Sequence, residues 1–399
     1  MGRIVVTGMG IITAIGKDAG ENYDALLNGR HGIGPVSLLD TRHRNEIPAG
    51  EIKLTNEELA ALCGIGKPEL YTRTALLGII AAREAFETGI ARYGINDHAR
   101  TALVSSSTVG GMDKTEQHFY DFLSNNEYAH YVHTHYCSDS SIKICDYLGL
   151  RHMNVTISTA CSSSVNAILF GAKLIRHGLA DRVIAGGTDA LSKFTLNGFN
   201  TLMILDREHC RPLDARRQGL NLGEGAAYIV LESEKTALKH HKEILCEISG
   251  YANANDAYHQ TASSPDGYGP YLSMKEALDM SGLKPSQIDY INAHGTGTDN
   301  NDLTEGLAID RIFAPRVPLV SSTKPFTGHT LAAAGVVETV FSILSIRNGI
   351  IFPNLNFSEK IAELSFEPVT ELRRADINHV ITNSFGFGGN DSSLVLSKY

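Results

Sequence analysis

The sequence has no long apolar run and no surplus of positive charge. Its longest apolar stretch, residues 75–82, is far shorter than the roughly 20 residues that cross a membrane as a helix. With 35 Lys and Arg against 44 Asp and Glu, the formal net charge is −9, whereas nucleic-acid binding needs a basic surface. A strand-like run begins at Arg3, which leaves no room for a signal peptide. We therefore expect a soluble, cytoplasmic protein with neither membrane nor nucleic acid among its partners.

Cysteine is also scarce, and no two cysteines form a C-x-x-C pair. The six cysteines stand at positions 63, 137, 145, 161, 210 and 246. Such scattered cysteines are typical of reduced cytosolic thiols rather than of a disulfide framework or a zinc site. The composition, 43% hydrophobic and 20% charged over 399 residues, is that of an ordinary globular protein. A chain of this length can form two domains or one large duplicated domain.

Histidine and tyrosine are concentrated between residues 118 and 137. His130, His133 and His135 have a spacing that could bind a metal ion. No nearby cysteine or carboxylate completes a set of ligands, so we expect no metal here. A solvated or interface loop is the reading that we favour for this region.

One cysteine lies at the junction of a predicted strand and a predicted helix. Val155 and Ile157 belong to a short β-branched run, and apolar residues from Val165 onward recur with helical spacing until Gly178. Cys161 therefore stands at a helix N-terminus among small residues. Unpaired N–H groups and the positive helix end favour a thiolate, so we expect its pKa to fall from about 8.5 towards neutrality. Cys161 is the predicted nucleophile.

The second half of the chain repeats this arrangement. Val317–Lys324 is again a strand, then small residues, then one chemically active residue, and a helix is predicted over Leu331–Ile346. Its end resembles the segment Ile175–Gly178. The repetition predicts an internally duplicated α/β fold with halves at residues 1–245 and 246–399.

Two histidines stand in glycine-rich segments of this second half. His294 follows a predicted strand within Asn292–Thr298, and His329 ends the segment Lys324–His329, just before a helix of small residues. A thiol nucleophile needs partners that polarise a thioester carbonyl and stabilise an enolate. One cysteine, two histidines and one lysine at strand ends therefore indicate catalysis, although each histidine alone would be more often structural.

With these motifs the chain resembles the β-ketoacyl-[acyl-carrier-protein] synthases, namely the Cys-His-His elongating type (synthase I and II) of the thiolase superfamily. The resemblance covers nearly the whole chain. It rests on Thr159–Ser163, Asn292–Thr298, Lys324–Gly335 and Asn383–Asn390, in this order. It implies a layered αβαβα fold of two similar halves, an acyltransferase activity, and a homodimer or a heterodimer with a chain-length partner.

The resemblance also implies a role for each site residue. Cys161 would take an acyl chain from the phosphopantetheine of an acyl carrier protein, and no other cofactor is implied. His294 and His329 would bind the malonyl thioester carbonyl, promote decarboxylation and stabilise the enolate. The N–H groups of Cys161 and Phe387 would form the oxyanion hole, and Phe387 would also gate access.

The resemblance assigns further residues to supporting roles. Lys324 would order the two histidines through acidic partners, other residues would contact the substrate, and basic residues would dock the acidic carrier. The acidic partners are Asp302, Glu305 and Glu338, the substrate contacts are Thr296, Thr298, Val109 and Phe385, and the docking residues are Lys67, Arg73, Arg207 and Arg211.

Some features disfavour related activities or depart from the family pattern. A degradative thiolase needs a second catalytic cysteine near its C-terminus, and none follows Cys246. Initiating synthases use Cys-His-Asn, and chain-length partners lack the nucleophile. Arg217–Leu220 reads Arg-Gln-Gly-Leu where the family usually shows Arg-Asp-Gly-Phe, and residues 118–137 are also atypical. Both departures lie near the acyl pocket or dimer contact of the family. Chain length, and the choice between fatty-acid elongation and a polyketide or polyene pathway, therefore stay open.

Overall fold

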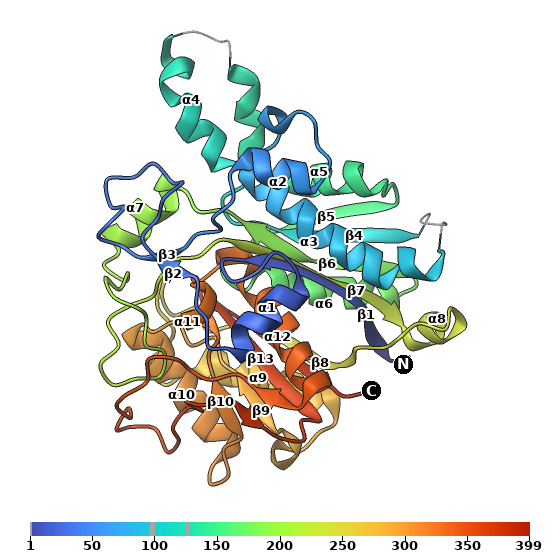
Figure 1. The fold of residues 1–399 in the computed structure, drawn as a ribbon. Coiled ribbons are helices and arrows are strands. Elements are labelled where there is room, and N and C mark those ends of the chain that lie inside the picture. The colour runs from blue at the N-terminus through green and yellow to red at the C-terminus, as the bar shows by residue number, and fades with distance from the viewer. Residues whose placement is uncertain (1, 96–99, 125–127) are drawn as a thin grey trace.

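The computed structural model describes residues 2–95, 100–124 and 128–399, which build one ten-stranded sheet with helices on both faces (Figure 1). The strands of this sheet are β1 (Ile4–Thr13), β4 (Thr101–Ser106), β5 (Met153–Ile157), β6 (Arg182–Asp189), β7 (Gly225–Ser233), β8 (Cys246–Asn255), β9 (Tyr290–Asn292), β10 (Leu319–Ser321), β13 (His379–Gly386) and β14 (Asn390–Ser397). Two-stranded ribbons join β2 (Ile33–Gly34) to β3 (Ala49–Gly50) and β11 (Ile350–Ile351) to β12 (Arg373–Arg374).

The α-helices come from all parts of the described chain. They are α1 (Ala19–Leu27), α2 (Asn56–Leu62), α3 (Arg73–Gly89), α4 (Met112–Ser124), α5 (Ser138–Leu148), α6 (Ser163–Arg176), α7 (Lys193–Thr201), α8 (Glu234–Lys239), α9 (Tyr268–Ser281), α10 (Asp299–Phe313), α11 (Lys324–Thr327) and α12 (Ala334–Asn348). Short 3₁₀ helices include η3 (Ala129–His135) and η5 (Leu331–Ala333).

The two halves of the sheet have the same topology. One half has the order β5-β4-β6-β7-β1 and the other β10-β9-β13-β14-β8, so each places its own strands in the order third, second, fourth, fifth, first. In both halves the second strand pairs in parallel with the third and the fourth, and the remaining pairs are antiparallel. The predicted duplicated α/β fold is therefore confirmed. The division at residue 245 stays a prediction.

The halves meet along a short seam and share a central helical layer. β1 pairs with β8 at only two positions, Val5 with Glu247 and Val6 with Cys246. Helices α6 and α12 pack against each other and contact strands of both halves. α3 and α5 cover the outer face of the first half, and α9 and α10 that of the second (Figure 1). This is the predicted αβαβα layering.

The central helix α12 is mostly apolar, and all its residues from Ala334 to Ile346 are buried. The segment Leu331–Asn348 is long and apolar enough to cross a membrane by length and composition, but 89% of it is buried inside the protein. It is therefore a core helix. The sequence predicts this helix from Leu331, whereas α12 begins at Ala334 because the preceding three residues form the 3₁₀ turn η5.

The histidine- and tyrosine-rich region forms α4 and η3, which project from the body of the first half (Figure 1). The ring of His118 stacks on Tyr128 and Tyr131, with centroids 4.1 and 4.9 Å away. The side chain of His130, which belonged to the metal spacing considered above, lies outside the described residues. Among the residues that the structure does describe, no three His, Cys, Asp or Glu side chains of this region come close enough together to hold a metal ion.

Candidate active site

Four segments from both halves converge at the carboxyl ends of the parallel strands. Cys161 follows β5, His294 follows β9, His329 follows β10 and Phe387 lies in the turn between β13 and β14. Equivalent strands of the two halves thus deliver the cysteine and the second histidine. The ligand atoms of Cys161, His294 and His329 all lie within 4.8 Å of one another, and the three side chains are buried. The structure therefore brings together the predicted catalytic residues.

Cys161 stands on a sharp turn between strand and helix. The residue before it, Ala160, has φ of +52°, and α6 begins two residues after it at Ser163. A left-handed conformation costs a residue with a β-carbon about 1–2 kcal/mol, so the surrounding contacts must hold this turn in place. One of these contacts is the hydroxyl of Ser384, which donates to the Cys161 carbonyl at 2.9 Å.

The Cys161 thiol is not the low-pKa thiolate that its place at a helix N-terminus predicts. Burial raises its pKa to about 11, although the Lys324 ammonium and the backbone N–H groups of Phe387 and Cys161 act in the opposite direction. The sequence-based prediction is wrong because removal from water penalises the thiolate more than these groups stabilise it. The resting side chain is a neutral thiol, placed against two N–H groups that can receive developing negative charge.

Both histidines present an N–H group towards the cavity. The Leu331 N–H donates to Nδ1 of His329 at 3.2 Å, so the ring proton is on Nε2, which lies 3.0 Å from Cys161 Sγ. Nδ1 of His294 faces the Lys324 ammonium at 3.2 Å, which likewise leaves the proton on Nε2. Burial, with Lys324 nearby, lowers the pKa of both rings well below the ordinary value. Each histidine is therefore a neutral donor.

Lys324 contacts only one of its three predicted acidic partners. Its ammonium pairs with Glu338 and donates to the carbonyl of His294. Glu305 instead accepts from the backbone N–H groups of His294 and Gly295, both at 2.8 Å. The prediction that Lys324 acts through Glu305 is therefore wrong, because that carboxylate accepts from these backbone groups and from the Asn383 amide at 3.0 Å.

Asp302 is likewise engaged by backbone groups and not by Lys324. It accepts from the N–H groups of Thr296 at 2.9 Å, Gly297 at 3.1 Å and Leu213 at 2.7 Å. The prediction that Lys324 acts through Asp302 is therefore also wrong. Asp302 and Glu305 shape the loop that carries His294, whereas Glu338 pairs with the buried ammonium, which needs an anionic partner.

The backbone of His329 is fixed by residues 221–223 of the first half. Its N–H donates to Asn221 O at 2.8 Å, and its carbonyl accepts from Gly223 N at 2.9 Å. A β-carbon added at Gly50 or Gly223 would lie 1.9 or 2.2 Å from the carbonyl oxygen of Thr327, which is closer than any real contact. Only glycine lets these segments approach each other so closely.

A cavity of about 260 Å³ leads from the surface to Cys161, His294 and His329. Among the predicted substrate contacts, Thr296, Thr298 and Phe385 line it, and so does Phe387. Val109 is not among the lining residues and lies in the neighbouring loop after β4.

The sequence-based reasoning missed several lining residues, among them the apolar Phe199 and Met203. The ring of Phe199 stacks on Phe387, with centroids 5.9 Å apart. Both lie on or just after α7, where no motif distinguishes them from ordinary surface apolar residues.

Comparison with known proteins bears on what this site does. Residues 1–237 match the model of the beta-ketoacyl synthase N-terminal domain, and residues 245–358 match that of the C-terminal domain. The chain belongs to the beta-ketoacyl synthase family. This synthase is therefore an acyltransferase with a thiolase-like fold, and the predicted family, fold and enzyme class are confirmed.

Individual relatives match the synthase along its whole length. The 3-oxoacyl-[acyl-carrier-protein] synthase 2 of Coxiella burnetii (strain RSA 493 / Nine Mile phase I) is 33% identical, over 99% of this chain and 98% of its own. The protein of the same name from Staphylococcus aureus (strain N315) is 34% identical, over 100% and 98%.

Solved structures of other ketosynthases also match this chain over its whole length. The ishigamide ketosynthase/chain length factor superimposes with a TM-score of 0.92 at 28% identity, covering 100% of this chain and 99% of its own. A ketosynthase in complex with its chain length factor from Xenorhabdus doucetiae gives 0.85 at 29% identity, covering 100% and 98%.

One of the four predicted docking residues of the synthase is not on the surface. The guanidinium of Arg73 is buried and forms two hydrogen bonds with the Glu224 carboxylate, at 2.6 and 2.8 Å. The prediction that Arg73 docks a carrier is therefore wrong, since its charge is used inside the protein. Lys67 is exposed, as docking requires.

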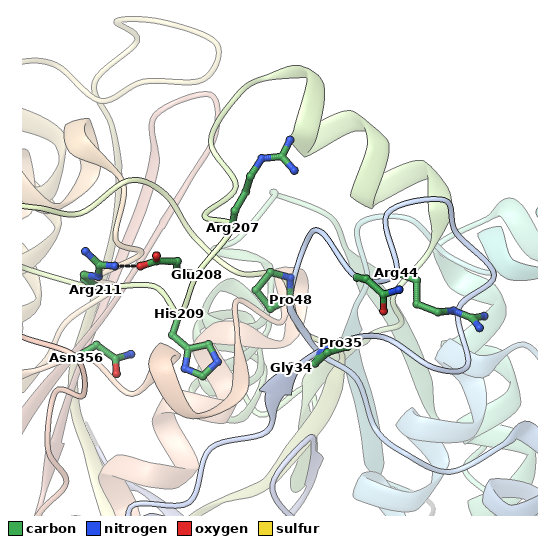
Figure 2. A pocket seen from close by; sticks show the side chains of 10 residues that line it. Gly34, Pro35, Arg44, Pro48, Arg207, Glu208, His209, Arg211 and Asn356 are labelled. Atoms are coloured by element: carbon green, nitrogen blue, oxygen red, sulfur yellow. Dashed lines mark hydrogen bonds and ion pairs between the residues drawn. The ribbon is translucent and has the colours of Figure 1, made fainter.

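Arg207 and Arg211 lie around a second cavity of about 480 Å³, which Arg44 also lines (Figure 2). Arg211 pairs with Glu208, and Arg207 lies 3.7 Å from a carboxylate oxygen of Glu46. Arg44 was missed because it comes from a loop some 160 residues earlier in the chain, with no motif around it.

Proposed function

We propose that the synthase lengthens an acyl chain, held as a thioester on Cys161, by decarboxylative condensation with a malonyl group on an acyl carrier protein. The observation that carries this proposal is the buried thiol 3.0 Å from one of two neutral histidines, each with its Nε2–H in the cavity. A thiol alone could accept an acyl group. Two uncharged N–H donors beside it are what a developing enolate needs.

In the first half-reaction the Cys161 sulfur attacks the acyl thioester of the carrier. The new bond joins Sγ to the acyl carbon, the bond to the pantetheine sulfur breaks, and the thiol proton passes to the departing sulfur. The N–H groups of Cys161 and Phe387 point at the sulfur and are placed to stabilise the oxyanion. One such donor contributes about 3 kcal/mol to lowering the barrier.

In the second half-reaction the malonyl thioester oxygen accepts from Nε2–H of both histidines. The bond to the carboxylate breaks, CO₂ leaves, and its electron pair forms the enolate. The enolate carbon attacks the acyl carbon, and Cys161 leaves as a thiolate that takes up one proton. Since burial keeps His294 and His329 neutral at pH 7, they donate hydrogen bonds without adding fixed positive charge.

The test separates the two half-reactions. His294→Ala and His329→Ala should each lower CO₂ release from malonyl-carrier by about 10²–10³-fold, the cost of one lost donor. Acylation of Cys161, followed by intact mass, should persist in part, whereas Cys161→Ala should abolish it. Loss of acylation with normal CO₂ release in the histidine variants would contradict these roles.

We also propose that the acidic carrier docks on the arginine cavity of Figure 2 and on Lys67. A surface of net charge −9 repels an acidic partner unless positive charge is gathered locally. Arg44→Glu with Arg207→Glu should raise the KM for a carrier-bound acyl chain, more at low salt than at high salt. Turnover of a small pantetheine thioester should stay nearly unchanged. An equal effect on both substrates would refute the docking surface.

The free edge of the described sheet bears on whether the synthase works with a second subunit. β5 ends the sheet, so its outer edge is unpaired in the described chain, and Val155 and Ile157 on it are only half-buried. We propose a homodimer through this edge, or pairing with a chain-length partner such as the one in the Xenorhabdus doucetiae complex. Light scattering should give twice the 43.2 kDa of one chain. A monomer that assembles only with another protein would replace the homodimer by the heterodimer.

The state of the cysteines bears on where in the cell the synthase works. All six cysteines lie in the described part of the chain and none forms a disulfide. We propose a cytoplasmic location and no cofactor other than the phosphopantetheine of the carrier.

A further inference from the structure

We propose that Asp189 is a positioning residue that sets the proton on the correct nitrogen of His329. The inference rests on the function proposed above and adds a residue that belongs to none of the motifs of this chain. Asp189 ends β6 and is fully buried. Its carboxylate accepts from Ser107 Oγ at 2.7 Å, from both the N–H and the hydroxyl of Thr108, and from Ala332 N at 2.9 Å.

The bond to Ala332 joins the two halves at the catalytic turn. Asp189, Ser107 and Thr108 belong to the first half, whereas Ala332 belongs to η5, which starts two residues after His329. Asp189 is thus the side chain through which the loop after β4 is tied to the turn carrying the histidine.

The turn η5 needs this hydrogen bond because its first residue, Leu331, has a strained backbone. Leu331 has φ of +52°, an unfavourable conformation for a residue with a β-carbon. This conformation aims the Leu331 N–H at His329 Nδ1, 3.2 Å away. The Asp189 carboxylate accepts from the N–H of the next residue, Ala332, and so holds Leu331 in this conformation. Because the Leu331 N–H then stays at Nδ1 of His329, the ring proton stays on Nε2.

Loss of the hydrogen bond between Asp189 and Ala332 should affect one half-reaction, decarboxylation, much more than the other. A relaxed turn withdraws the Leu331 N–H, and Nδ1 can then carry the proton in place of Nε2. The malonyl oxygen loses one donor, so decarboxylation slows. Acylation of Cys161 uses the backbone N–H groups of Cys161 and Phe387 and should be affected little.

The experiment compares Asp189→Asn with the wild-type enzyme in both half-reactions. Asparagine has the same shape but only one acceptor oxygen, which cannot serve all the donors. We expect CO₂ release from malonyl-carrier to fall about 10–100-fold, the range expected for misplacement of a catalytic group. Acylation of Cys161 should stay within about twofold. Ser107→Ala is the matched control, because it removes one donor to Asp189 but leaves the Ala332 bond, and it should affect decarboxylation much less.

A spectroscopic measurement distinguishes positioning from general support. In enzyme labelled with ¹⁵N-histidine, Nε2 of His329 should have the shift of a protonated nitrogen in the wild type and move towards that of an unprotonated one in Asp189→Asn. The signal is assigned by its loss in His329→Ala. If Asp189→Asn does not fold, Asp189→Glu keeps both oxygens but displaces them, and decarboxylation should again fall more than acylation.

Two results would overturn the inference. Either both half-reactions fall by the same factor in Asp189→Asn, or the His329 signal and the rate of decarboxylation stay as in the wild type. His329→Ala, measured in parallel, separates this failure from that of the proposed function. If His329→Ala itself releases CO₂ normally, the function proposed for the histidine is wrong, whatever Asp189→Asn does.

Discussion

Arg73 offers a sharp test of whether its charge serves folding or docking. Its side chain is 11% exposed and that of Glu224 is 1% exposed. Besides the two bonds to Glu224, its guanidinium donates to the carbonyls of Ile52 at 2.7 Å and Leu54 at 2.8 Å. Replacing Arg73 with Met removes these donors and leaves a buried carboxylate without its counter-charge.

The expected cost is large. Removing one partner of a buried ion pair costs about 3–5 kcal/mol, out of a free energy of unfolding of about 5–15 kcal/mol. Arg73→Met should therefore lower the urea midpoint clearly. The double variant Arg73→Met with Glu224→Gln should recover about 2 kcal/mol, because the uncompensated charge is gone and glutamine still accepts from Ile52 N. Lys67→Met, at an exposed site, should change stability by less than about 0.5 kcal/mol.

Kinetics complete the test. Because Glu224 follows Gly223, the pair holds the segment that supports His329, so Arg73→Met should slow a carrier-bound substrate and a small pantetheine thioester by similar factors. Lys67→Met should raise KM only for the carrier-bound substrate. If Arg73→Met unfolds at the wild-type urea concentration and impairs only the carrier-bound substrate, the buried-pair reasoning is refuted and Arg73 is a docking residue.

Three further predictions concern titrating groups. Limiting iodoacetamide should label Cys137 before Cys161, because burial raises the pKa of both thiols, that of Cys161 to about 11, and only Cys137 is half-buried; mass mapping that finds Cys161 first would indicate a thiolate. Lys324→Met should lower CO₂ release from malonyl-carrier by about 10²-fold, because His294 Nδ1 loses the ammonium that keeps its proton on Nε2; an unchanged rate would contradict that tautomer. Burial, with Asp256 nearby, raises the pKa of Asp391 to about 8, so the folded state binds more protons than the unfolded chain between about pH 4 and pH 8, and stability falls as the pH rises through this range. Asp391→Asn should remove that fall and gain on the order of 3–4 kcal/mol at pH 7 in urea unfolding; equal slopes in both proteins would contradict it.

The elements around the catalytic residues could be predicted because their signals are local. The β-branched run at Val155 and Ile157 lies in β5, and the helical spacing from Val165 corresponds to α6. The matching unit around Lys324 then indicated the duplication, which the identical strand orders confirm. Such patterns repeat within a few residues, so they survive without knowledge of the tertiary structure.

Properties that depend on distant partners could not be predicted in this way. Arg73 reads as a surface cation at the start of a helix, because its partner Glu224 lies 151 residues further along the chain. The pKa of Cys161 depends on how completely the second half covers the thiol, which no local pattern records. Asp189 is similar, since its role becomes visible only when Ala332 lies beside it.

The close contact of Gly50 and Gly223 with Thr327 has a consequence for how variants of this enzyme are read. Neither glycine reaches the cavity, yet a methyl group at either position would displace the peptide two residues before His329. A mutational scan scored by activity would therefore group both positions with the cysteine and the histidines. Sensitivity to substitution here measures how closely three chain segments are packed, so a map of inactivating positions would extend well beyond the atoms that take part in the reaction.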